Sequence, residues 1–159
     1  MHGIIGTTAD LIYFSEPGAI NEAISDIFGI YSHFKILGGA IEWEIGTQAH
    51  WFGRSAANPK QFQHPDTYKG QYWYYGYGDN AGVHTNSGVL NHIFYMLVVG
   101  EKGKNDNQKN YEVKAIGLEK AFAIVYRALI RYLTRYSRYY NARRAFVIAA
   151  SDMYGSYSA

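Results

Sequence analysis

Residues 1–29 read MHGIIGTTADLIYFSEPGAINEAISDIFG, and the second half of this stretch decides the fold. The SEPG run is a helix start signal, with a proline near the first helical position and an acid beside the positive end of the helix dipole. From Ala19 to Phe34, apolar residues recur at helical spacing on more than one stripe of the surface. Because such a helix is buried on most sides, the sequence predicts a central helix that other elements pack around.

Two carboxylates lie within this apolar helix. Glu22 and Asp26 are four residues apart, so they share one face. A buried carboxylate is costly unless it meets a partner, and both a metal ion and an arginine would serve. Acids at this spacing most often form a solvated face, but the apolar surroundings favour a functional pair here.

His2 begins another run with helix-like spacing, which extends to Tyr13. A lone histidine is more often structural or exposed than a metal ligand. Spacing alone therefore does not assign His2 to a site.

Length and composition indicate one globular domain. The chain has 159 residues, of which 48% are hydrophobic and 17% aromatic. It has no cysteine, which excludes disulfides, thiolate zinc sites and cysteine nucleophiles. Fifteen basic and thirteen acidic residues give a net charge of +2, a balance that does not indicate a nucleic acid partner.

Several further features bear on partners and location. No apolar run approaches a membrane-spanning length, so we expect no membrane partner. No basic segment followed by a long apolar core is visible, so the sequence shows no signal peptide. Arginines gather between residues 127 and 144, and we interpret them as solvated helix faces.

The run LIYFSEPGAINEAISDIFG, residues 11–29, closely resembles the thermolysin family of zinc metallopeptidases. In that family a helix carries the motif HExxH, and a glutamate about twenty residues later, in a GAxNExxSDxFG run, completes the zinc site. His2 and Glu22 stand 20 residues apart, like the second histidine of HExxH and the third ligand. The resemblance implies that His2 and Glu22 bind zinc, and that Asp26 orients a histidine ligand.

HExxH also needs a histidine and a general-base glutamate before His2, and both positions would lie upstream of Met1. The resemblance therefore implies a domain over residues 1–159 that is truncated at its N-terminus. It also implies a short C-terminal end, because relatives continue with one more helix.

Residues 42–46, EWEIG, are similar to a calcium-binding region of the family. The resemblance makes Glu42 and Glu44 candidate calcium ligands and places Ile45 in the substrate pocket. Two exposed glutamates on a loop would explain the same residues equally well.

Residues 53–59, GRSAANP, resemble the family segment whose arginine holds a backbone carbonyl of the substrate. The resemblance implies that role for Arg54. Without it, a surface arginine in a salt bridge is the preferred interpretation.

Residues 79–88, DNAGVHTNSG, resemble the family motif DNGGVHxNSG, with Ala81 replacing a glycine. The resemblance implies that His84 donates a hydrogen bond to the developing oxyanion and that Asp79 fixes its tautomer. As an imidazolium, such a histidine stabilises negative charge. Tyr13 matches the family tyrosine that assists it. We expect Ala81 to change little, provided that the backbone there does not need a positive φ.

The rest of the chain predicts three more helices and two loops. Residues 89–99 predict a buried helix, and residues 118–133 and 142–153 predict two amphipathic helices. Residues 48–82 predict a long ordered loop packed on the body, and residues 100–110 a hydrophilic surface loop. The expected fold class is mainly α: an orthogonal helical bundle like the thermolysin C-terminal domain, with a long irregular aromatic-rich loop.

The leading functional hypothesis is a zinc-dependent endopeptidase domain, which in the complete enzyme hydrolyses peptide bonds through an activated water. Its partners would be a peptide or protein substrate and the missing N-terminal half, and the family resemblance implies secretion. The alternative is an inactive fragment or binding remnant, because two protein ligands are fewer than the three of a catalytic zinc. A third hypothesis is a carbohydrate or peptide binder that uses the aromatic loop around Trp73.

Overall fold

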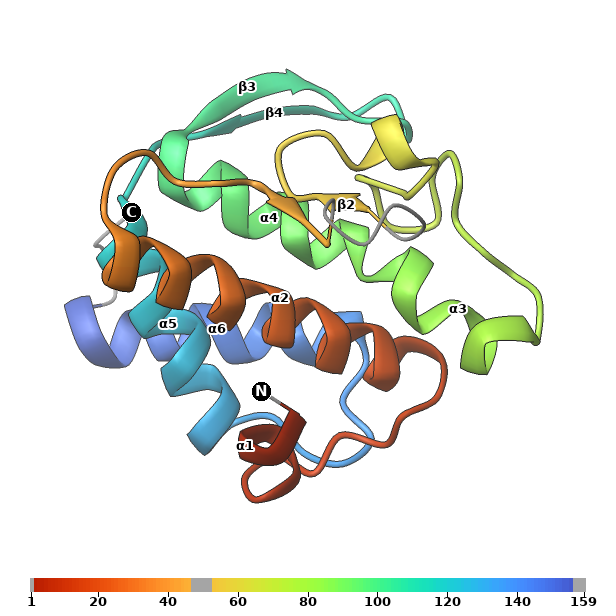
Figure 1. Cartoon of the computed structure of the whole chain (residues 1–159), viewed down its shortest axis with the longest axis horizontal. Helices are drawn as coiled ribbons and strands as arrows, with labels where there is room; N and C mark the ends of the chain where they lie inside the picture. Colours follow the sequence, from red (N-terminus) through yellow and green to blue (C-terminus); the bar gives the residue numbers. More distant parts are fainter. Residues whose placement is uncertain (1, 47–52, 156–159) are drawn as a thin grey trace.

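The long helix α2 (Ser15–Leu37) is the centre of the fold (Figure 1). The computed structural model describes residues 2–46 and 53–155, and within these ranges α2 contacts every other α-helix. Its isoleucines at 20, 24 and 27 are fully buried, which confirms the predicted buried helix. The helix ends where Gly38 takes a φ of +66°, a left-handed conformation that glycine adopts without strain.

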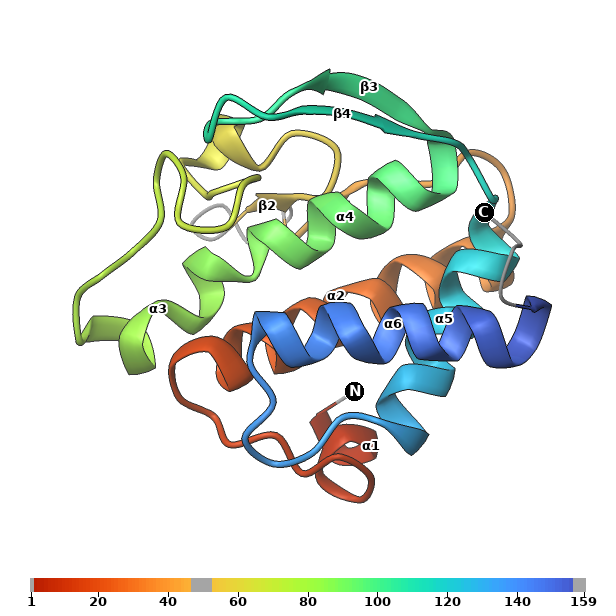
Figure 2. The ribbon, with the colours of Figure 1, turned by 180° about the vertical axis from the view of Figure 1, so that it is seen from behind.

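The remaining helices surround α2. They are α1 (His2–Gly6), α3 (Gly78–Asn86), α4 (Gly88–Val99), α5 (Leu118–Arg131) and α6 (Tyr139–Tyr154). Helix α5 runs steeply across the directions of α2 and α6 in both ribbon views (Figures 1 and 2). The mainly helical fold class is therefore confirmed, and the three predicted helices after residue 88 correspond to α4, α5 and α6. No helix in the described ranges is long and apolar enough to cross a lipid bilayer.

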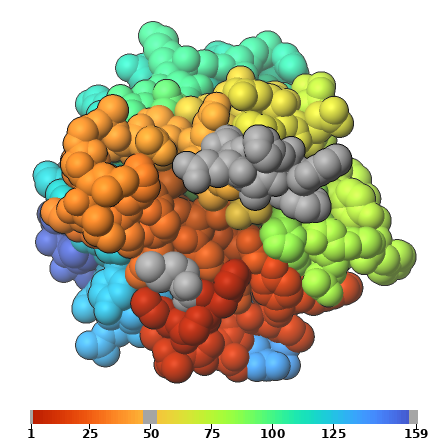
Figure 3. Space-filling model, in the orientation of Figure 1, coloured from red at the N-terminus to blue at the C-terminus, as the bar shows by residue number. Residues whose placement is uncertain are grey.

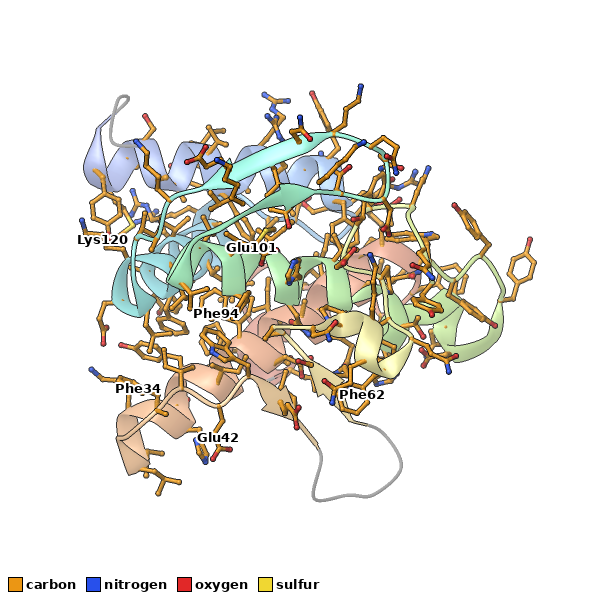
Figure 4. All side chains as sticks on the ribbon, turned by 90° about the horizontal axis from the view of Figure 1, so that it is seen from above. Phe34, Glu42, Phe62, Phe94, Glu101 and Lys120 are labelled. Atoms are coloured by element: carbon orange, nitrogen blue, oxygen red, sulfur yellow. The ribbon has the colours of Figure 1, made fainter. Side chains whose placement is uncertain are left out.

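The core lies between α2 and the helices that cover it. Phe94 of α4 is fully buried and lies beside α2 when the molecule is seen from above (Figure 4). Two polar residues of α4 are also buried: Asn91 donates to Asp26 at 2.9 Å, and His92 Nδ1 lies 3.1 Å from the Ala56 carbonyl oxygen. His92 thus has the structural role that its apolar surroundings indicate.

The first helix is shorter than its apolar run predicts, because α1 ends at Gly6. The hydroxyl groups of Thr7 and Thr8 donate to the Gly3 and Ile4 carbonyl oxygens and compete with continued helix formation. Residues 7–14 then lead as irregular backbone into α2.

The expectation of a loop over residues 100–110 was wrong. The segment forms an antiparallel hairpin of β3 (Glu101–Lys104) and β4 (Asn110–Val113), in which Glu101 pairs with Val113 and Lys104 with Asn110. Its side chains alternate between half-buried and exposed, so one face of the hairpin covers α4 although its composition is polar. Because most residues of this segment are polar, its composition did not indicate the alternation.

Residues 53–77 of the aromatic-rich segment are irregular but packed on the body, residues 78–82 belong to α3, and residues 48–52 lie outside the described ranges. The segment contains β2 (Arg54–Ser55), paired with β1 (Glu44–Ile45), and the short 3₁₀ helix η2 (Pro59–Phe62). The Trp73 ring contacts Tyr68 and Tyr139, with ring centroids 5.0 and 5.8 Å away. Lys60 Nζ joins the segment to the hairpin, at 2.9 Å from Asp66 and 2.6 Å from Asp106.

Candidate active site

Four side chains converge on the carboxylate of Glu22, which is only 5% exposed. His2 Nε2 lies 3.5 Å from Oε1, His84 Nε2 lies 3.5 Å from Oε2, Arg54 Nη2 lies 3.8 Å from Oε2, and the Tyr13 hydroxyl donates to Oε1. These side chains come from α1, α3, β2 and the segment before α2. Figure 3 shows this face, where the red residues of the N-terminal segment meet the green residues of α3.

His2 is oriented as a metal ligand would be. The Asn21 amide nitrogen donates to the Leu11 carbonyl oxygen at 3.3 Å, so the amide oxygen accepts a hydrogen bond from His2 Nδ1 at 2.8 Å. This assigns the lone pair to Nε2, which faces the Glu22 carboxylate. Two acceptors facing one another are the arrangement that a cation bridges, so this pair fits two zinc ligands.

The donor set remains incomplete within the described ranges. Residues 2–46 and 53–155 contain no group of three or more histidine, cysteine, aspartate or glutamate side chains arranged to hold a metal ion. A catalytic zinc has three protein ligands, so His2 and Glu22 fit zinc in chemical type but not in number.

His84 and Tyr13 form a second part of the site. Asp79 Oδ1 lies 2.6 Å from His84 Nδ1, and its other oxygen accepts the His84 backbone N–H at 3.0 Å. The ring is therefore fixed with Nε2 directed at Glu22 and at the Tyr13 hydroxyl, 3.1 Å away. Burial and the hydrogen bond to Glu22 raise the pKa of Tyr13, so its hydroxyl keeps its proton and can donate.

Asp26 meets an arginine. Its two carboxylate oxygens accept hydrogen bonds from Arg54 Nε and Nη2, each at 2.7 Å, and Asn91 donates a third. The Arg54 side chain is 16% exposed, so this is a largely buried, bidentate ion pair. The sequence analysis allowed a metal ion or an arginine as the partner of a buried carboxylate, and the partner of Asp26 is an arginine.

A cleft of about 800 Å³ lies beside these groups and is lined by Arg54, Phe62, His64, Asp79 and His84. Burial, followed by the nearby Arg54 charge, lowers the pKa of His64, which favours a neutral ring. Its Nδ1 is buried and makes no hydrogen bond in the described structure. Phe62 and His64 were missed by the sequence reasoning, because only the turn at η2 brings them back beside Arg54.

The residues expected to bind calcium lie at another cavity. Glu42, Glu44 and Ile45 line a cavity of about 330 Å³ together with Asp26 and His33. Glu42 projects near the C-terminal end of α2, away from Phe62 and the cleft (Figure 4). Ile45 is paired with Arg54 across the β1–β2 ladder, yet this residue lines the second cavity and not the cleft.

The backbone that carries Asp79 is strained. Asp79, Asn80, Ala81 and Gly82 all have a φ between +49° and +79°, which makes one left-handed turn before the right-handed part of α3. The replacement of a glycine by Ala81 was expected to change little only if the backbone there needs no positive φ. That condition is not met, because the φ of Ala81 is +64°. This conformation costs an alanine roughly 1–2 kcal/mol and a glycine almost nothing.

Ala81→Gly is expected to stabilise the fold by about 0.5 kcal/mol, because relief of the left-handed strain exceeds the entropy that glycine adds to the unfolded chain. The free energy of unfolding from urea titration measures this. The matched control is Ala123→Gly, inside α5, which should lose about 1 kcal/mol. A loss at both positions would contradict a strained turn at residue 81.

Comparison with known proteins gives a consistent picture. A family model described as "Thermolysin metallopeptidase, alpha-helical domain" matches residues 9–159, a range that contains every candidate residue except His2. The thermostable neutral protease NprT of Geobacillus stearothermophilus and a thermolysin of Alicyclobacillus acidocaldarius are each 41% identical over 99% of this chain. The chain spans 28% of the length of each relative.

A solved structure has the same fold. The precursor of protealysin, a metalloproteinase from Serratia proteamaculans, superimposes on 96% of this chain with a TM-score of 0.73 and 27% sequence identity. The chain covers 49% of that structure.

Proposed function

Because this chain belongs to the thermolysin metallopeptidase family, through its match to the alpha-helical domain, we propose that it supplies the helical half of a zinc endopeptidase active site. The observation that carries the proposal is the convergence of His2, Tyr13, Arg54 and His84 on Glu22 beside an open cleft. In this proposal His2 and Glu22 hold the metal. A third ligand and the general base come from polypeptide outside the described residues.

Bound zinc would supply Lewis acidity to a peptide carbonyl and to a water molecule. The described side chains would orient the substrate and stabilise the charge that develops on it. The Tyr13 hydroxyl and His84 Nε2 lie 3.1 Å apart, each beside one oxygen of the Glu22 carboxylate, so both can donate to an oxyanion formed there. Asp79 holds the His84 ring in place through its contact with Nδ1.

Arg54 lines the cleft while Asp26 accepts hydrogen bonds from one edge of its guanidinium, through Nε and Nη2. We propose that its remaining N–H donors bind a backbone carbonyl of a peptide or protein substrate in the cleft. Ile45 would contact a side chain of that substrate. Because this residue lines the neighbouring cavity, this contact requires the substrate to reach past the β1–β2 ladder.

Two further properties are proposed from the family alone. Calcium would bind at Glu42 and Glu44, although His33 Nε2 lies 3.8 Å from Glu42 and calcium prefers oxygen ligands. The protein would act outside the cell, because proteases of the thermolysin family are secreted.

The alternative, a catalytically inactive fragment or binding remnant, is favoured by the two-ligand count within the described ranges. We expect the purified chain alone not to cleave peptides. We expect a chimera, with the N-terminal portion of the G. stearothermophilus relative placed before this chain, to cleave a peptide in a chelator-sensitive manner.

Cleavage by the chimera that is abolished by Glu22→Ala would support the proposal, with Glu119→Ala on an exposed helix face as the matched control. A folded chimera that binds zinc and does not cleave would favour the inactive remnant. Chelator-sensitive cleavage by the purified chain alone would contradict the two-ligand argument.

The third hypothesis, a carbohydrate or peptide binder, stays a prediction. The Trp73 ring is half-buried against Tyr68 and Tyr139, while Tyr75 and Tyr77 of the same segment are exposed.

A further inference from the structure

The charge of this chain is divided unevenly. Residues 120–151 carry seven of the fifteen basic residues and none of the thirteen acidic ones, so the rest of the chain has an excess of acid. The small net charge of the whole chain conceals this asymmetry. A block of one sign on a folded surface produces a local field that a partner of the opposite sign can recognise.

Four of these arginines form no ion pair with any carboxylate that the structure describes. Arg127 pairs with Asp152 at 3.3 Å, and Arg135 pairs with Asp10. Within residues 2–46 and 53–155, no ion pair is formed by Arg131, Arg138, Arg143 or Arg144, all of which are exposed. Their charge is therefore not neutralised by neighbouring acids.

Amphipathic and aliphatic side chains lie among these arginines. Tyr136 and Tyr140 are 68% and 66% exposed, and Val147 and Ile148 are 59% and 40% exposed. The Arg144 guanidinium lies 5.9 Å from the centre of the Tyr140 ring. Together, Arg131, Tyr136, Arg138, Tyr140, Arg143, Arg144, Val147 and Ile148 define what we call the α6 surface.

The α6 surface lies along one helix and the ends of its neighbours. Tyr140, Arg144 and Ile148 are spaced four residues apart on α6 and therefore share one helical stripe. Arg131 ends α5, and Tyr136 and Arg138 lie in the segment that joins α5 to α6. Figure 2 shows α6 lying across the face opposite to the view of Figure 1, with this joining segment beneath it.

We propose that the α6 surface docks on the headgroup layer of an anionic lipid bilayer. Arginines attract acidic lipid headgroups, tyrosine rings occupy the layer between water and acyl chains, and exposed aliphatic side chains reach the edge of that layer. A nucleic acid would use the arginines and the tyrosines but would leave Val147 and Ile148 in water. A bilayer explains all three kinds of side chain.

Contact of this kind needs no spanning helix. The expectation of no membrane partner rested on the lack of a long apolar run, and that observation concerns insertion only. The excess of acidic residues on the rest of the chain does not oppose this binding. A flat bilayer touches one face of the protein and leaves the other faces in water.

The test is co-sedimentation of the purified chain with vesicles of phosphatidylcholine, alone or mixed with phosphatidylglycerol. We expect binding to the mixed vesicles only, weakened by added salt. Each arginine near an acidic surface contributes roughly a fivefold change in binding. The triple variant Arg138→Ala, Arg143→Ala, Arg144→Ala should therefore bind about a hundredfold more weakly.

The matched control is the triple variant Lys102→Ala, Lys104→Ala, Lys109→Ala, which removes the same charge from the β3–β4 hairpin and should bind within about twofold of the parent. Replacing the same three arginines with lysine should retain binding, and circular dichroism verifies folding. The double variant Tyr140→Ala, Ile148→Ala should weaken vesicle binding even at high salt.

Three outcomes would overturn the proposal. The first is equal binding to neutral and acidic vesicles. The second is an equal loss in the two triple variants, which would indicate a response to total charge alone. The third is tight binding to single-stranded poly(dT) without vesicle binding, which would assign the surface to nucleic acid. None of these measurements depends on peptidase activity.

Discussion

Asp26→Ala is expected to lower the free energy of unfolding by about 3 kcal/mol, the usual consequence of leaving one member of a buried ion pair without its partner. Asp26 accepts both parallel hydrogen bonds of Arg54 and one from Asn91, and its side chain is only 6% exposed. In the variant, Arg54 would retain Glu22 as its nearest carboxylate, at 3.8 Å and without an ideal hydrogen bond. Urea denaturation followed by circular dichroism measures the loss.

Lys35→Ala is the matched control, because it breaks an ion pair with Glu119 that lies in water. We expect no measurable change from it. The double variant Asp26→Leu, Arg54→Met should be more stable than Asp26→Ala, since apolar side chains can replace a buried ion pair without leaving a charge. If Asp26→Ala lowered the free energy of unfolding no more than Lys35→Ala does, the buried ion pair would not have the stabilising role stated here, and water or Glu22 would have to balance the charge of Arg54.

His84→Ala is expected to lower kcat about 10²–10³-fold in the active chimera, the usual effect of removing one donor to an oxyanion. His84 Nε2 faces Glu22 and the Tyr13 hydroxyl, and in the proposed reaction it would donate to the oxyanion as negative charge develops there. An interaction made in the transition state changes kcat and kcat/KM together and leaves KM nearly constant. Initial rates over a range of peptide concentrations separate the two constants.

His33→Ala is the control for this prediction, because His33 lies at the cavity of Glu42 and Glu44 and does not line the cleft. It should leave both constants unchanged. A kcat unaffected by His84→Ala, with intact zinc binding, would remove His84 from the reaction and leave it as a partner of Asp79.

Much of the fold was predictable from local patterns. The apolar periodicity of residues 19–34 predicts α2, and comparable patterns predict α4, α5 and α6, because a buried helix face repeats at 3.6 residues. The β3–β4 hairpin was not predictable from composition. Along both strands, half-buried residues alternate with exposed ones, but most of them are polar. A hydropathy pattern therefore does not reveal which residues face the body.

The resemblance to the family named residues that the structure brings together around Glu22, but it did not indicate how they pair. The residues that it named include Glu22, Asp26, Arg54 and His84. No local pattern could indicate that Arg54 donates two hydrogen bonds to Asp26. That contact joins residues 28 positions apart through the β1–β2 pairing. Phe62 and His64 enter the cleft for the same kind of reason, because the turn at η2 returns the chain beside Arg54.

The sequence by itself determined the central helix, the spacing of His2 and Glu22, and the identity of the family, because each depends on residues close together along the chain. Only the tertiary structure decided that His2, Tyr13, Arg54 and His84 meet at one carboxylate, and that Ala81 lies in a left-handed turn. It also placed the arginines, tyrosines and aliphatic residues of the α6 surface together. The physical reason is that long-range contacts and backbone strain depend on how elements pack, and packing is a property of the whole chain.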